Sequence, residues 1–436
     1  MKSKIKYFWF LLKGSFWFLP IVIIGLSQGA AVLMIYLDTT FNYQPEGFIR
    51  YFFLDSVDSA RSVLSIIAAA MIGVAGTVFS ITLVALTLAS SQFGSRLLRN
   101  FMYDRLNQVV LGTYVSTFAY CIIILKTVRS ESFTFTPNFS VLLAIFLALG
   151  NIILLIIFIH HISISIQADR VISDVGSELS RGIRRLFPVK MGEGKDENDL
   201  DRNALLTNLE YQYSLNCKKD GYLQSIDNES LIRSAKKNEV VVELNHRPGH
   251  YLVEGIQLLK VYSSKPVENE AIENLHDAFV YGDIRTPHQD AEFAIHQLVE
   301  IAARALSPGV NDPYTAIACI DKLTSSMGYL TKVSFPKSIR LDDDQEIRVL
   351  TSPSSFESMM DASFNQIRYF AVGSPAVLSK LMQSFVTINK LAETEEQKIA
   401  ITRHVGRLLK AAENSVDDGY YIQEIKSLRK EYFEEE

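Results

Sequence analysis

The sequence predicts a membrane protein with an α-helical four-span bundle, followed by a cytoplasmic α+β domain with a small β module and a helical C-terminal part. Three observations predict this fold class. Hydrophobic residues make up 48% of the 436 residues, and their excess lies before about residue 162. That region contains four long apolar stretches. The remainder alternates short β-rich runs with amphipathic helical runs, as a soluble domain does.

The four apolar stretches run over about residues 16–37, 63–91, 108–126 and 139–161. A hydrocarbon core of about 30 Å is crossed by about 20 helical residues, so each stretch is long enough to span it. The first follows a lysine-rich tail, as a signal peptide would. Its apolar run exceeds a signal core of about 7–15 residues, and no A-x-A site ends it. We therefore interpret it as a retained anchor.

Lysine and arginine residues near the ends of the stretches predict the orientation. They are more frequent in the N-terminal tail, in the loop after the second stretch and in the region after the fourth than in the other two loops. Because such residues accumulate on the cytoplasmic side of a membrane, we expect both termini and everything after about residue 162 to be cytoplasmic.

The second stretch carries an unusual set of small and hydroxyl residues on or beside one helical face. They are Gly73, Gly76, Thr77, Ser80, Thr87 and Ser91. One interpretation is close helix packing, because small residues let backbones approach and hydroxyls bond between helices. The other is a pore-lining face in an oligomer, where hydroxyls replace part of an ion's hydration shell. The apolar cores hold no carboxylate or lysine, which disfavours a proton-driven pump.

Residues 162–188 predict an amphipathic stalk helix that continues the fourth span. Apolar residues recur there at steps of three and four: Ile172, Val175, Leu179, Ile183 and Leu186. The helix would connect the two halves mechanically, or its apolar face would form a short coiled-coil seam. Pro188 and the polar run 191–201 mark a break after it.

The soluble part is predicted to contain a small β-rich module at 205–265 and a mainly helical domain at 270–436. Strands are expected at 222–226, 240–244 and 251–261, a hairpin at 338–351, and helices at 355–371, 375–391, 395–415 and 417–433. The run at 247–261 is similar in part to a biotinyl or lipoyl module. No lysine occupies a tight turn there, so no covalent cofactor is expected, and none of another kind.

A helix predicted at about 288–306 carries a ladder of alternating residues four positions apart. These are His288, Glu292, His296 and Glu300, which share one face of such a helix. Histidine and carboxylate side chains bind divalent cations, and histidine also titrates near neutral pH. The ladder is therefore a candidate cation or proton site, or else an ion-pair face or an oligomer interface. We assign no metal to it.

Several classes of function are disfavoured. The formal charge of −5 gives no support for nucleic-acid binding, which needs a basic face. Cys121, Cys217 and Cys319 follow no metal-binding spacing and are interpreted as reduced structural thiols. No phosphate-loop, dinucleotide, HExxH, GxSxG or kinase motif occurs. An enzyme would need titratable groups that converge around Asp290, His296 and Asp312.

Three long strings resemble a bacterial family of predicted membrane proteins that is catalogued as a domain of unknown function. They are GVAGTVFSITLVALTLASSQFGSRLLRNF (73–101), NQVVLGTYVSTFAYC (107–121) and RTPHQDAEFAIHQLVEIAARALSPGVNDPYTA (285–316). The resemblance extends over roughly residues 15–420. It implies a multi-pass protein of the bacterial cytoplasmic (inner) membrane and supplies no activity and no catalytic residues.

The leading hypothesis is a homo-oligomeric channel-like protein in the lipid bilayer. Its second span would line the path, the stalk would transmit, and its cytoplasmic domain would gate; a possible ion or small-ligand partner is not identified. The alternative is a membrane-anchored scaffold or sensor, whose cytoplasmic domain binds a protein or small ligand without transport. The absence of a catalytic motif favours both over an enzyme.

Overall fold

The computed structural model describes residues 16–40, 56–94, 104–128, 137–188, 206, 209–415 and 419–433. The chain divides into two compact units, Met1–Arg170 and Val171–Glu436. Some sequence features lie outside the described residues. They are the lysine-rich tail, Arg96 and Arg99 in the loop after the second span, the polar run 191–201 and the acidic end 434–436.

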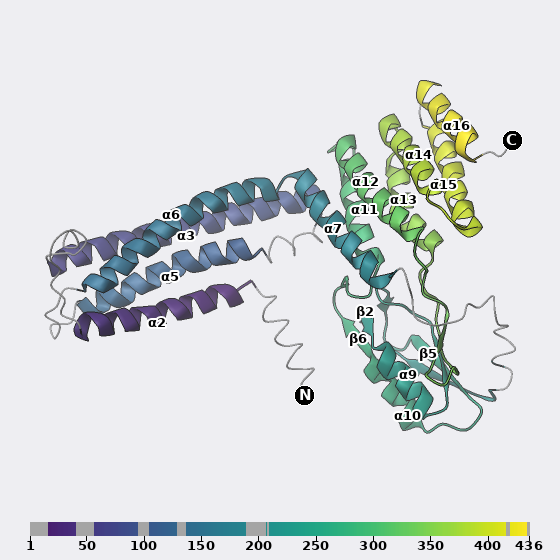
Figure 1. Ribbon diagram of the computed structural model, residues 1–436, viewed down its shortest axis with the longest axis horizontal. Helices are drawn as coiled ribbons and strands as arrows, with labels where there is room; N and C mark the ends of the chain where they lie inside the picture. The colour runs from purple at the N-terminus through teal and green to yellow at the C-terminus, as the bar shows by residue number, and fades with distance from the viewer. Residues whose placement is uncertain are drawn as a thin grey trace. The chain divides into compact units, whose positions relative to one another are not determined.

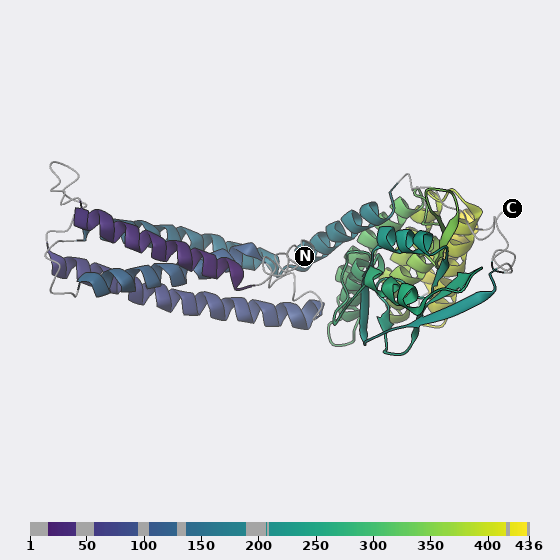
Figure 2. The same ribbon diagram turned by 90° about the horizontal axis from the view of Figure 1, so that it is seen from below.

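The first unit consists of four long helices that lie alongside one another in both perpendicular views (Figures 1 and 2). They are α2 (Phe18–Thr40), α3 (Val57–Phe93), α5 (Arg105–Val128) and α6 (Asn138–Ser165). All four are long and apolar enough to cross a membrane, as the sequence predicts. The second is longer than expected, at 37 residues, because Ser56 caps its N-terminus by accepting a hydrogen bond from the Ser59 amide.

Helix α5 packs against each of the other three helices. A Cβ atom at Gly112 would lie 3.0 Å from the Pro20 Cα, so glycine permits the close approach of α2. On the other side, the buried Tyr114 hydroxyl donates to the Asn151 carbonyl at 2.6 Å, and Tyr120 donates to the Ser140 carbonyl at 2.9 Å. Hydrogen bonds between helices in apolar surroundings fix the register of α5 against α6.

The C-terminal end of α2 is joined to the N-terminal end of α6 by one carboxylate. Asp38 is 5% exposed and accepts hydrogen bonds from the Phe139 amide at 2.8 Å, the Ser140 amide at 3.0 Å and the Ser140 hydroxyl at 2.6 Å. A carboxylate at a helix N-terminus satisfies free amides and interacts favourably with the helix dipole. Asp38 therefore acts as the cap of a helix that begins a hundred residues later in the chain.

The prediction that α6 continues unbroken through the stalk is wrong. It ends at Ser165, and α7 (Ala168–Leu186) begins after a break at Ile166 and Gln167. Just before the break, Ser163 and Ser165 donate to carbonyls four residues back, at 2.8 and 2.7 Å, a bond that weakens and bends helices.

The predicted apolar face of α7 is confirmed, since Ile172, Val175, Leu179 and Ile183 are buried. Within the second unit this helix packs against α12 (Pro313–Leu330). The Tyr329 hydroxyl donates to the Phe187 carbonyl at 3.1 Å, and a Cβ at Gly176 would lie 2.9 Å from the Lys322 side chain. The chain's own helices thus cover the face that a coiled-coil seam would use.

The second unit contains two small sheets. The larger has the order β1-β5-β3-β8-β7, and the smaller has the order β4-β2-β6. Their strands are β1 (Tyr211–Asn216), β2 (Gly221–Ile226), β3 (Val241–Leu244), β4 (Tyr251–Leu252), β5 (Gln257–Ser263), β6 (Phe279–Gly282), β7 (Ile339–Leu341) and β8 (Ile347–Leu350). All neighbouring strands are antiparallel except β3 and β8, which are parallel.

The larger sheet crosses the limit predicted for the β-rich module at residue 265. The hairpin of β7 and β8 is confirmed, but β8 also pairs with β3, with Val349 opposite Val242. Both valines are buried, at 3% and 0% exposure, so the pairing covers apolar side chains that each segment alone would leave exposed. The module therefore includes strands from the region predicted to be mainly helical.

Three short helical segments accompany the sheets: α9 (Asn228–Lys237), α10 (Asn269–Glu273) and the 3-10 helix η4 (Asn274–Ala278). The first, α9, follows directly after β2. Asp227 begins it by accepting a hydrogen bond from the Ser230 amide at 3.0 Å, and Leu231 and Ala235 are buried beneath it. Aspartate favours both turns and helix N-caps, so the residue type alone did not separate them.

The remaining helices of the described residues are α11 (Glu292–Ala305), α12, α13 (Phe356–Phe370), α14 (Pro375–Asn389), α15 (Glu395–Glu413) and α16 (Gly419–Phe433). The last four confirm the helices predicted for the C-terminal region. Asp312 caps α12, with Pro313 in its first turn. Thr394 and Gln397 form a capping box at the start of α15, because each side chain bonds the other's backbone amide.

The three cysteines are buried and unpaired. Burial raises the pKa of the Cys217 and Cys319 thiols, so both stay protonated at neutral pH. Their environment fits the structural role expected of them.

Candidate functional site

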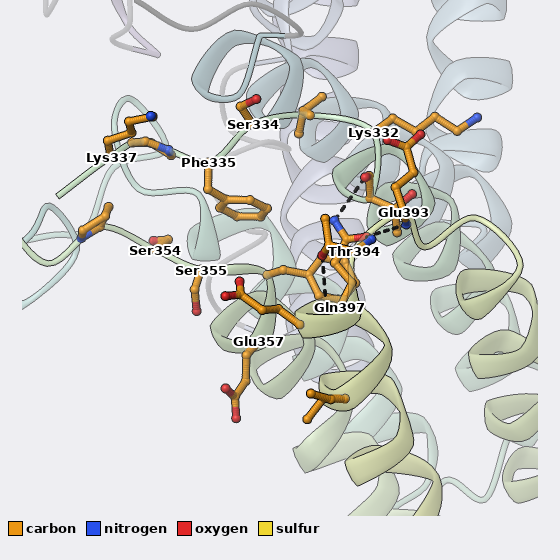
Figure 3. Close-up of a pocket in the computed structure, with 17 residues that line it drawn as sticks. Lys332, Ser334, Phe335, Lys337, Ser354, Ser355, Glu357, Glu393, Thr394 and Gln397 are labelled. Carbon is orange, nitrogen blue, oxygen red and sulfur yellow. Dashed lines mark hydrogen bonds between the residues drawn. The ribbon is translucent and has the colours of Figure 1, made fainter. Parts of the chain in front are cut away.

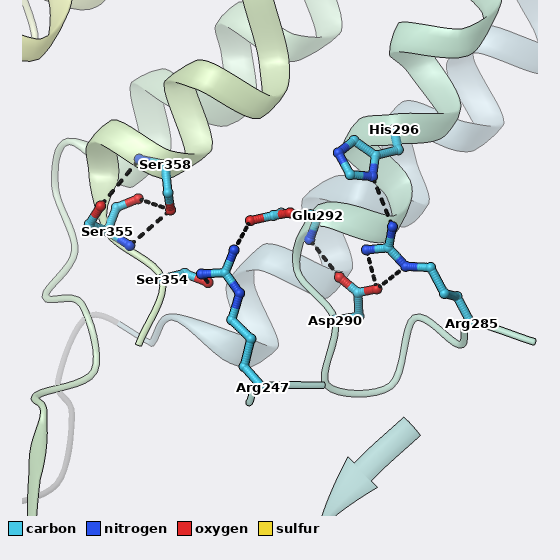
Figure 4. A network of polar contacts seen from close by, with 8 residues as sticks. All are labelled: Arg247, Arg285, Asp290, Glu292, His296, Ser354, Ser355 and Ser358. Carbon is cyan, nitrogen blue, oxygen red and sulfur yellow. Dashed lines mark hydrogen bonds and ion pairs between the residues drawn. The ribbon is translucent and has the colours of Figure 1, made fainter. Parts of the chain in front are cut away.

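Charged side chains gather around the N-terminus of α11, where the helical part of the second unit meets the sheets. Figure 4 shows two arginine-centred clusters there. Arg247 comes from the loop between β3 and β4, and Arg285 from the segment between β6 and α11. Each lies against a carboxylate at the start of α11, where a helix dipole favours negative charge.

The first cluster joins Arg247 to Glu292 and Ser354. The guanidinium donates to Glu292 Oε1 at 2.5 Å and to the Ser354 hydroxyl at 3.2 Å (Figure 4). The two charged side chains are 29% and 18% exposed. Partial burial strengthens such a pair relative to one on an open surface. The contact ties the β3–β4 loop to α11 and to the segment that precedes α13.

The second cluster joins Arg285 to Asp290 and His296. Arg285 donates to Asp290 Oδ2 at 2.7 Å from Nε and lies 2.5 Å from it with Nη2; Nη1 donates to His296 Nδ1 at 3.1 Å. The Asp290 side chain is 4% exposed. Burial raises the pKa of its carboxyl, and the neighbouring Arg285 opposes that effect. A Cβ at Gly249, whose φ is +100°, would lie 2.5 Å from Asp290 Oδ2.

The predicted His/Glu ladder is not continuous. The first helical residue is Glu292, so His288 precedes α11 and does not share its face. Asp290 explains the later start, because its carboxylate accepts a hydrogen bond from the Glu292 amide at 3.1 Å and so terminates the preceding turn. The helical members contact arginines: Glu292 contacts Arg247, and His296 accepts from Arg285.

Glu300 extends this pattern, since its carboxylate lies 3.6 Å from the Arg304 Nε one turn along the helix. Arginines thus occupy positions that a cation would take beside the ladder. Among the residues that the structure describes, no three His, Cys, Asp or Glu side chains converge as metal ligands. The pattern resembles the ion-pair face more closely than the cation site.

The three groups that an enzyme would need are divided between two places. Asp290 and His296 both contact Arg285. Asp312 instead caps α12: its carboxylate accepts hydrogen bonds from the Thr315 amide at 3.1 Å and from the Thr315 hydroxyl at 2.6 Å. Its carboxylate is therefore engaged in helix capping.

A cleft of about 350 Å³ opens beside these clusters, and we call it the Arg340 cleft. Its walls come from the end of α7, the β3–β4 loop, the start of α11, and the β7–β8 hairpin with the segment after it. The lining residues used below are Leu186, Phe187, Ile226, Asn228, Leu244, His246, Arg247, Asp290, Glu292, Arg340, Val349, Thr351, Ser352 and Ser354. Its volume lies at the lower end of small-molecule sites.

A wider groove of about 750 Å³ adjoins this cleft and shares Pro336, Pro353 and Ser354 with it (Figure 3). Its charged lining is mixed, with Lys332 and Lys337 on one segment and glutamates on α13 and before and within α15. Gln397 braces one wall by donating to the Thr331 carbonyl at 3.1 Å. Because the groove is open and its charges are mixed, its lining does not indicate one class of ligand.

In the first unit, the predicted polar face of α3 points away from the other helices. Its six residues are exposed in the single chain, whereas the buried face of α3 carries Leu64, Ala68, Met71, Ala75 and Val78. The hydroxyls of Thr77, Ser80 and Thr87 donate to carbonyls four residues back, at 2.9–3.3 Å. They therefore satisfy their own hydrogen-bond donors without another helix.

Sequence reasoning missed the arginines that organise the site. Arg247, Arg285 and Arg340 lie on three separate segments. Arginine is a common surface residue, so none of the three stands out by its residue type. A signal was present for two of them, because Arg247 begins an Arg-Pro-Gly turn and Arg285 begins the long string that ends at 316. For Arg340 the sequence contains no comparable signal.

Four helices that are long and apolar enough to cross a membrane, followed by an α+β unit with a polar cleft, place the chain in the class of predicted membrane proteins. Comparison with known proteins agrees with this class. The family model described as "Predicted membrane protein (DUF2254)" matches residues 13–387, and the chain belongs to that family.

Relatives in mycobacteria extend the similarity over most of the chain. The "Uncharacterized protein Rv1290c" of Mycobacterium tuberculosis (strain H37Rv) is 30% identical over 419 residues, which cover 93% of this chain and 78% of the relative. The "Uncharacterized protein Mb1321c" of Mycobacterium bovis matches with the same identity and coverage. No solved structure gives a significant match.

Proposed function

We propose that α2, α3, α5 and α6 span the bacterial cytoplasmic (inner) membrane, with both termini and the second unit in the cytoplasm. The outward side chains of the four helices support this proposal, because they are large and apolar. Examples are Leu26, Phe79, Phe146 and Ile156, which are 51–71% exposed in the chain alone. Lipid would cover such a surface, and the lysine and arginine bias of the loops favours the stated orientation.

We further propose that the second unit is a ligand-binding sensor domain of this membrane protein. The observation that carries the proposal is the Arg340 cleft, which combines a half-buried arginine, several hydroxyl and amide groups and an apolar wall. Few convergent polar groups on an apolar background are typical of small-molecule sites.

The second candidate function is a homo-oligomeric channel. The outward polar face of α3 favours it, because a face of Gly73, Gly76, Thr77, Ser80, Thr87 and Ser91 is poorly suited to lipid and well suited to another copy or to water. A single chain directs that face away from its own bundle. Any pore that it lines would therefore require several copies around one axis.

One experiment tests the sensor function directly. The full-length protein in detergent is heated with and without a protein-free, small-molecule filtrate of bacterial cytosol. A ligand that binds the folded state raises the unfolding temperature. Ser352→Trp places a large ring in the cleft lining and should abolish the rise, whereas Thr387→Trp on the exposed side of α14 should leave it unchanged. Equal rises in both variants would refute the cleft as the ligand site.

The channel candidate is tested by flux in liposomes of phosphatidylethanolamine and phosphatidylglycerol. Potassium and chloride flux should be present in the wild type, lost in Ser80→Leu and Thr87→Leu, and retained in Ile81→Leu, which alters a neighbouring face of α3. Oligomer size is measured in parallel, so that loss of assembly is distinguished from loss of conduction. The flux is measured from about pH 5 to 8, the range over which an ordinary histidine side chain changes its charge. Absence of flux in the wild type throughout that range would reject this candidate.

A further inference from the structure

Arg340 brings a positive charge to the cleft, and no described residue supplies a counter-charge for it. Arg340 lies on β7 opposite Val349 of β8, and both residues line the Arg340 cleft. Its guanidinium is partly buried, and burial lowers its pKa. Among the described residues, none forms an ion pair or hydrogen bond with this side chain. A desolvated guanidinium with five donors is costly to leave without an acceptor.

The other charges of the cleft are already matched. Arg247 is paired with Glu292 at 2.5 Å, and Asp290 is paired with Arg285, which stands just outside the lining. His246 donates its Nε2–H to the Gln257 carbonyl at 3.1 Å. An imidazole supplies no negative charge that could balance Arg340. Once these pairs are formed, the uncompensated charge of the cleft is the positive charge of Arg340.

Part of the cleft lining is apolar. It comes from Leu186 and Phe187 at the end of α7, Ile226 at the end of β2, Leu244 at the end of β3 and Val349 opposite Arg340. The lining also holds neutral polar residues, with Asn228 at the start of α9 and with Thr351 and Ser352 after β8. A ligand that satisfies Arg340 and the apolar lining needs one anionic group and a compact apolar body.

We propose that the Arg340 cleft binds a small organic anion, with a carboxylate or phosphate group on the Arg340 guanidinium and an apolar body against Leu186, Phe187 and Leu244. The planar guanidinium presents paired donors that match both kinds of anionic group in a bidentate manner. Asn228, Thr351 and Ser352 supply hydrogen bonds to the polar atoms that remain. This inference rests on the proposed sensor function and adds the chemical class of the ligand.

The cleft volume of about 350 Å³ limits the ligand to roughly the size of a substituted aromatic acid or a phosphorylated small metabolite. Two probes represent the two anionic groups on one apolar body: benzoate and phenyl phosphate. Benzamide is the neutral counterpart of benzoate. Inorganic phosphate tests whether the anionic group alone suffices.

The test is calorimetric titration of the full-length protein in detergent with each probe. At least one of benzoate and phenyl phosphate should bind with a Kd below about 10 mM, and benzamide should bind at least tenfold more weakly, because a charge-assisted hydrogen bond contributes about tenfold or more in affinity. Arg340→Met should weaken the anion by at least about tenfold. Arg340→Lys should recover part of the loss. Arg233→Met, an exposed arginine on α9 outside the cleft, is the matched control.

The outcomes separate this inference from the proposed function. Binding of benzamide and benzoate with equal affinity, lost in Ser352→Trp and unaffected by Arg340→Met, would overturn the anion inference and leave the cleft as a ligand site. Absence of binding by every probe, together with no stabilisation by the cytosolic filtrate, would overturn both. Preference for phenyl phosphate over benzoate would assign a phosphate group, and the reverse preference a carboxylate.

Discussion

A pH change should weaken the helical part of the second unit through one buried histidine. His404 on α15 is 1% exposed, and its ring lies 5.7 Å from that of Phe385. Its Nε2 is 3.2 Å from Asp361 Oδ1 but out of hydrogen-bond alignment. Both ring nitrogens thus lack a hydrogen-bond partner among the described residues. The neutral ring is accommodated there, and a charged ring would be poorly solvated.

Burial lowers the pKa of His404 to about 4 from its usual 6.5; Asp361 opposes the effect, and Arg407, Arg368 and Arg403 reinforce it. Because the unfolded chain takes up the proton first as the pH falls, the stability contributed by neutral His404 is complete above about pH 6.5. It is lost progressively as the pH falls towards 4. At about 1.4 kcal/mol per pKa unit, the full loss is roughly 3 kcal/mol.

The assay is hydrogen exchange of α15 amides in the full-length protein between pH 4.5 and 7, corrected for the intrinsic pH dependence of exchange. Wild-type protein should lose about 2–3 kcal/mol of opening free energy over that interval. His404→Leu, which nearly conserves volume, should lose markedly less and stay within about 1.5 kcal/mol of wild type at pH 7. His288→Leu alters an exposed histidine and should behave as wild type. Equal pH slopes in wild type and His404→Leu would refute the reasoning.

Three further substitutions have matched controls. Asp38→Ala removes the cap of α6 and should lower the free energy of unfolding by at least about 2 kcal/mol. The Asp58 side chain is 89% exposed, so Asp58→Ala should lower it little. Thermal unfolding followed by circular dichroism compares the two variants. Gly249→Ala combines a strained φ with a clash against Asp290 and should destabilise the second unit by about 2–4 kcal/mol. Gly255→Ala, at φ +84° with open space around the Cβ among the described residues, should cost about 1 kcal/mol; equal costs would contradict the clash. Glu292→Gln weakens a half-buried pair and should cost about 1–3 kcal/mol by hydrogen exchange in the first turn of α11, while Glu300→Gln should change stability by less than about 0.5 kcal/mol.

The long helices of both units could be predicted because their signals are local. A run of about 20 apolar residues defines a spanning helix by itself. In the same way, Asp312 before Pro313 and Thr394 before Gln397 define helix starts within four residues of sequence. The buried face of α7 was also visible as a spacing of three and four. Each of these signals requires no knowledge of what lies opposite.

The features that sequence reasoning missed depend on distant partners. Whether β8 joins the sheet of β3 depends on a pairing between residues 242 and 349, which no local pattern encodes. His288 lies outside the predicted His/Glu ladder for a related reason. The Asp290 carboxylate accepts a hydrogen bond from the Glu292 amide, so α11 begins only at Glu292. Arg340 is distinguished by having no partner among the described residues, a property that belongs to its surroundings and not to its sequence neighbours.

The bond between Asp38 and the start of α6 bears on how the first unit is made. The ribosome makes the chain in order, so α2 is complete while the donors at residues 139 and 140 are still unsynthesised. If the four helices span a membrane as proposed, the carboxylate would need water or lipid headgroups at the membrane surface until then. Its capture by α6 would make the closed bundle a late product of biogenesis. A nascent chain truncated before α6 would therefore present an unclosed bundle to membrane quality-control proteases.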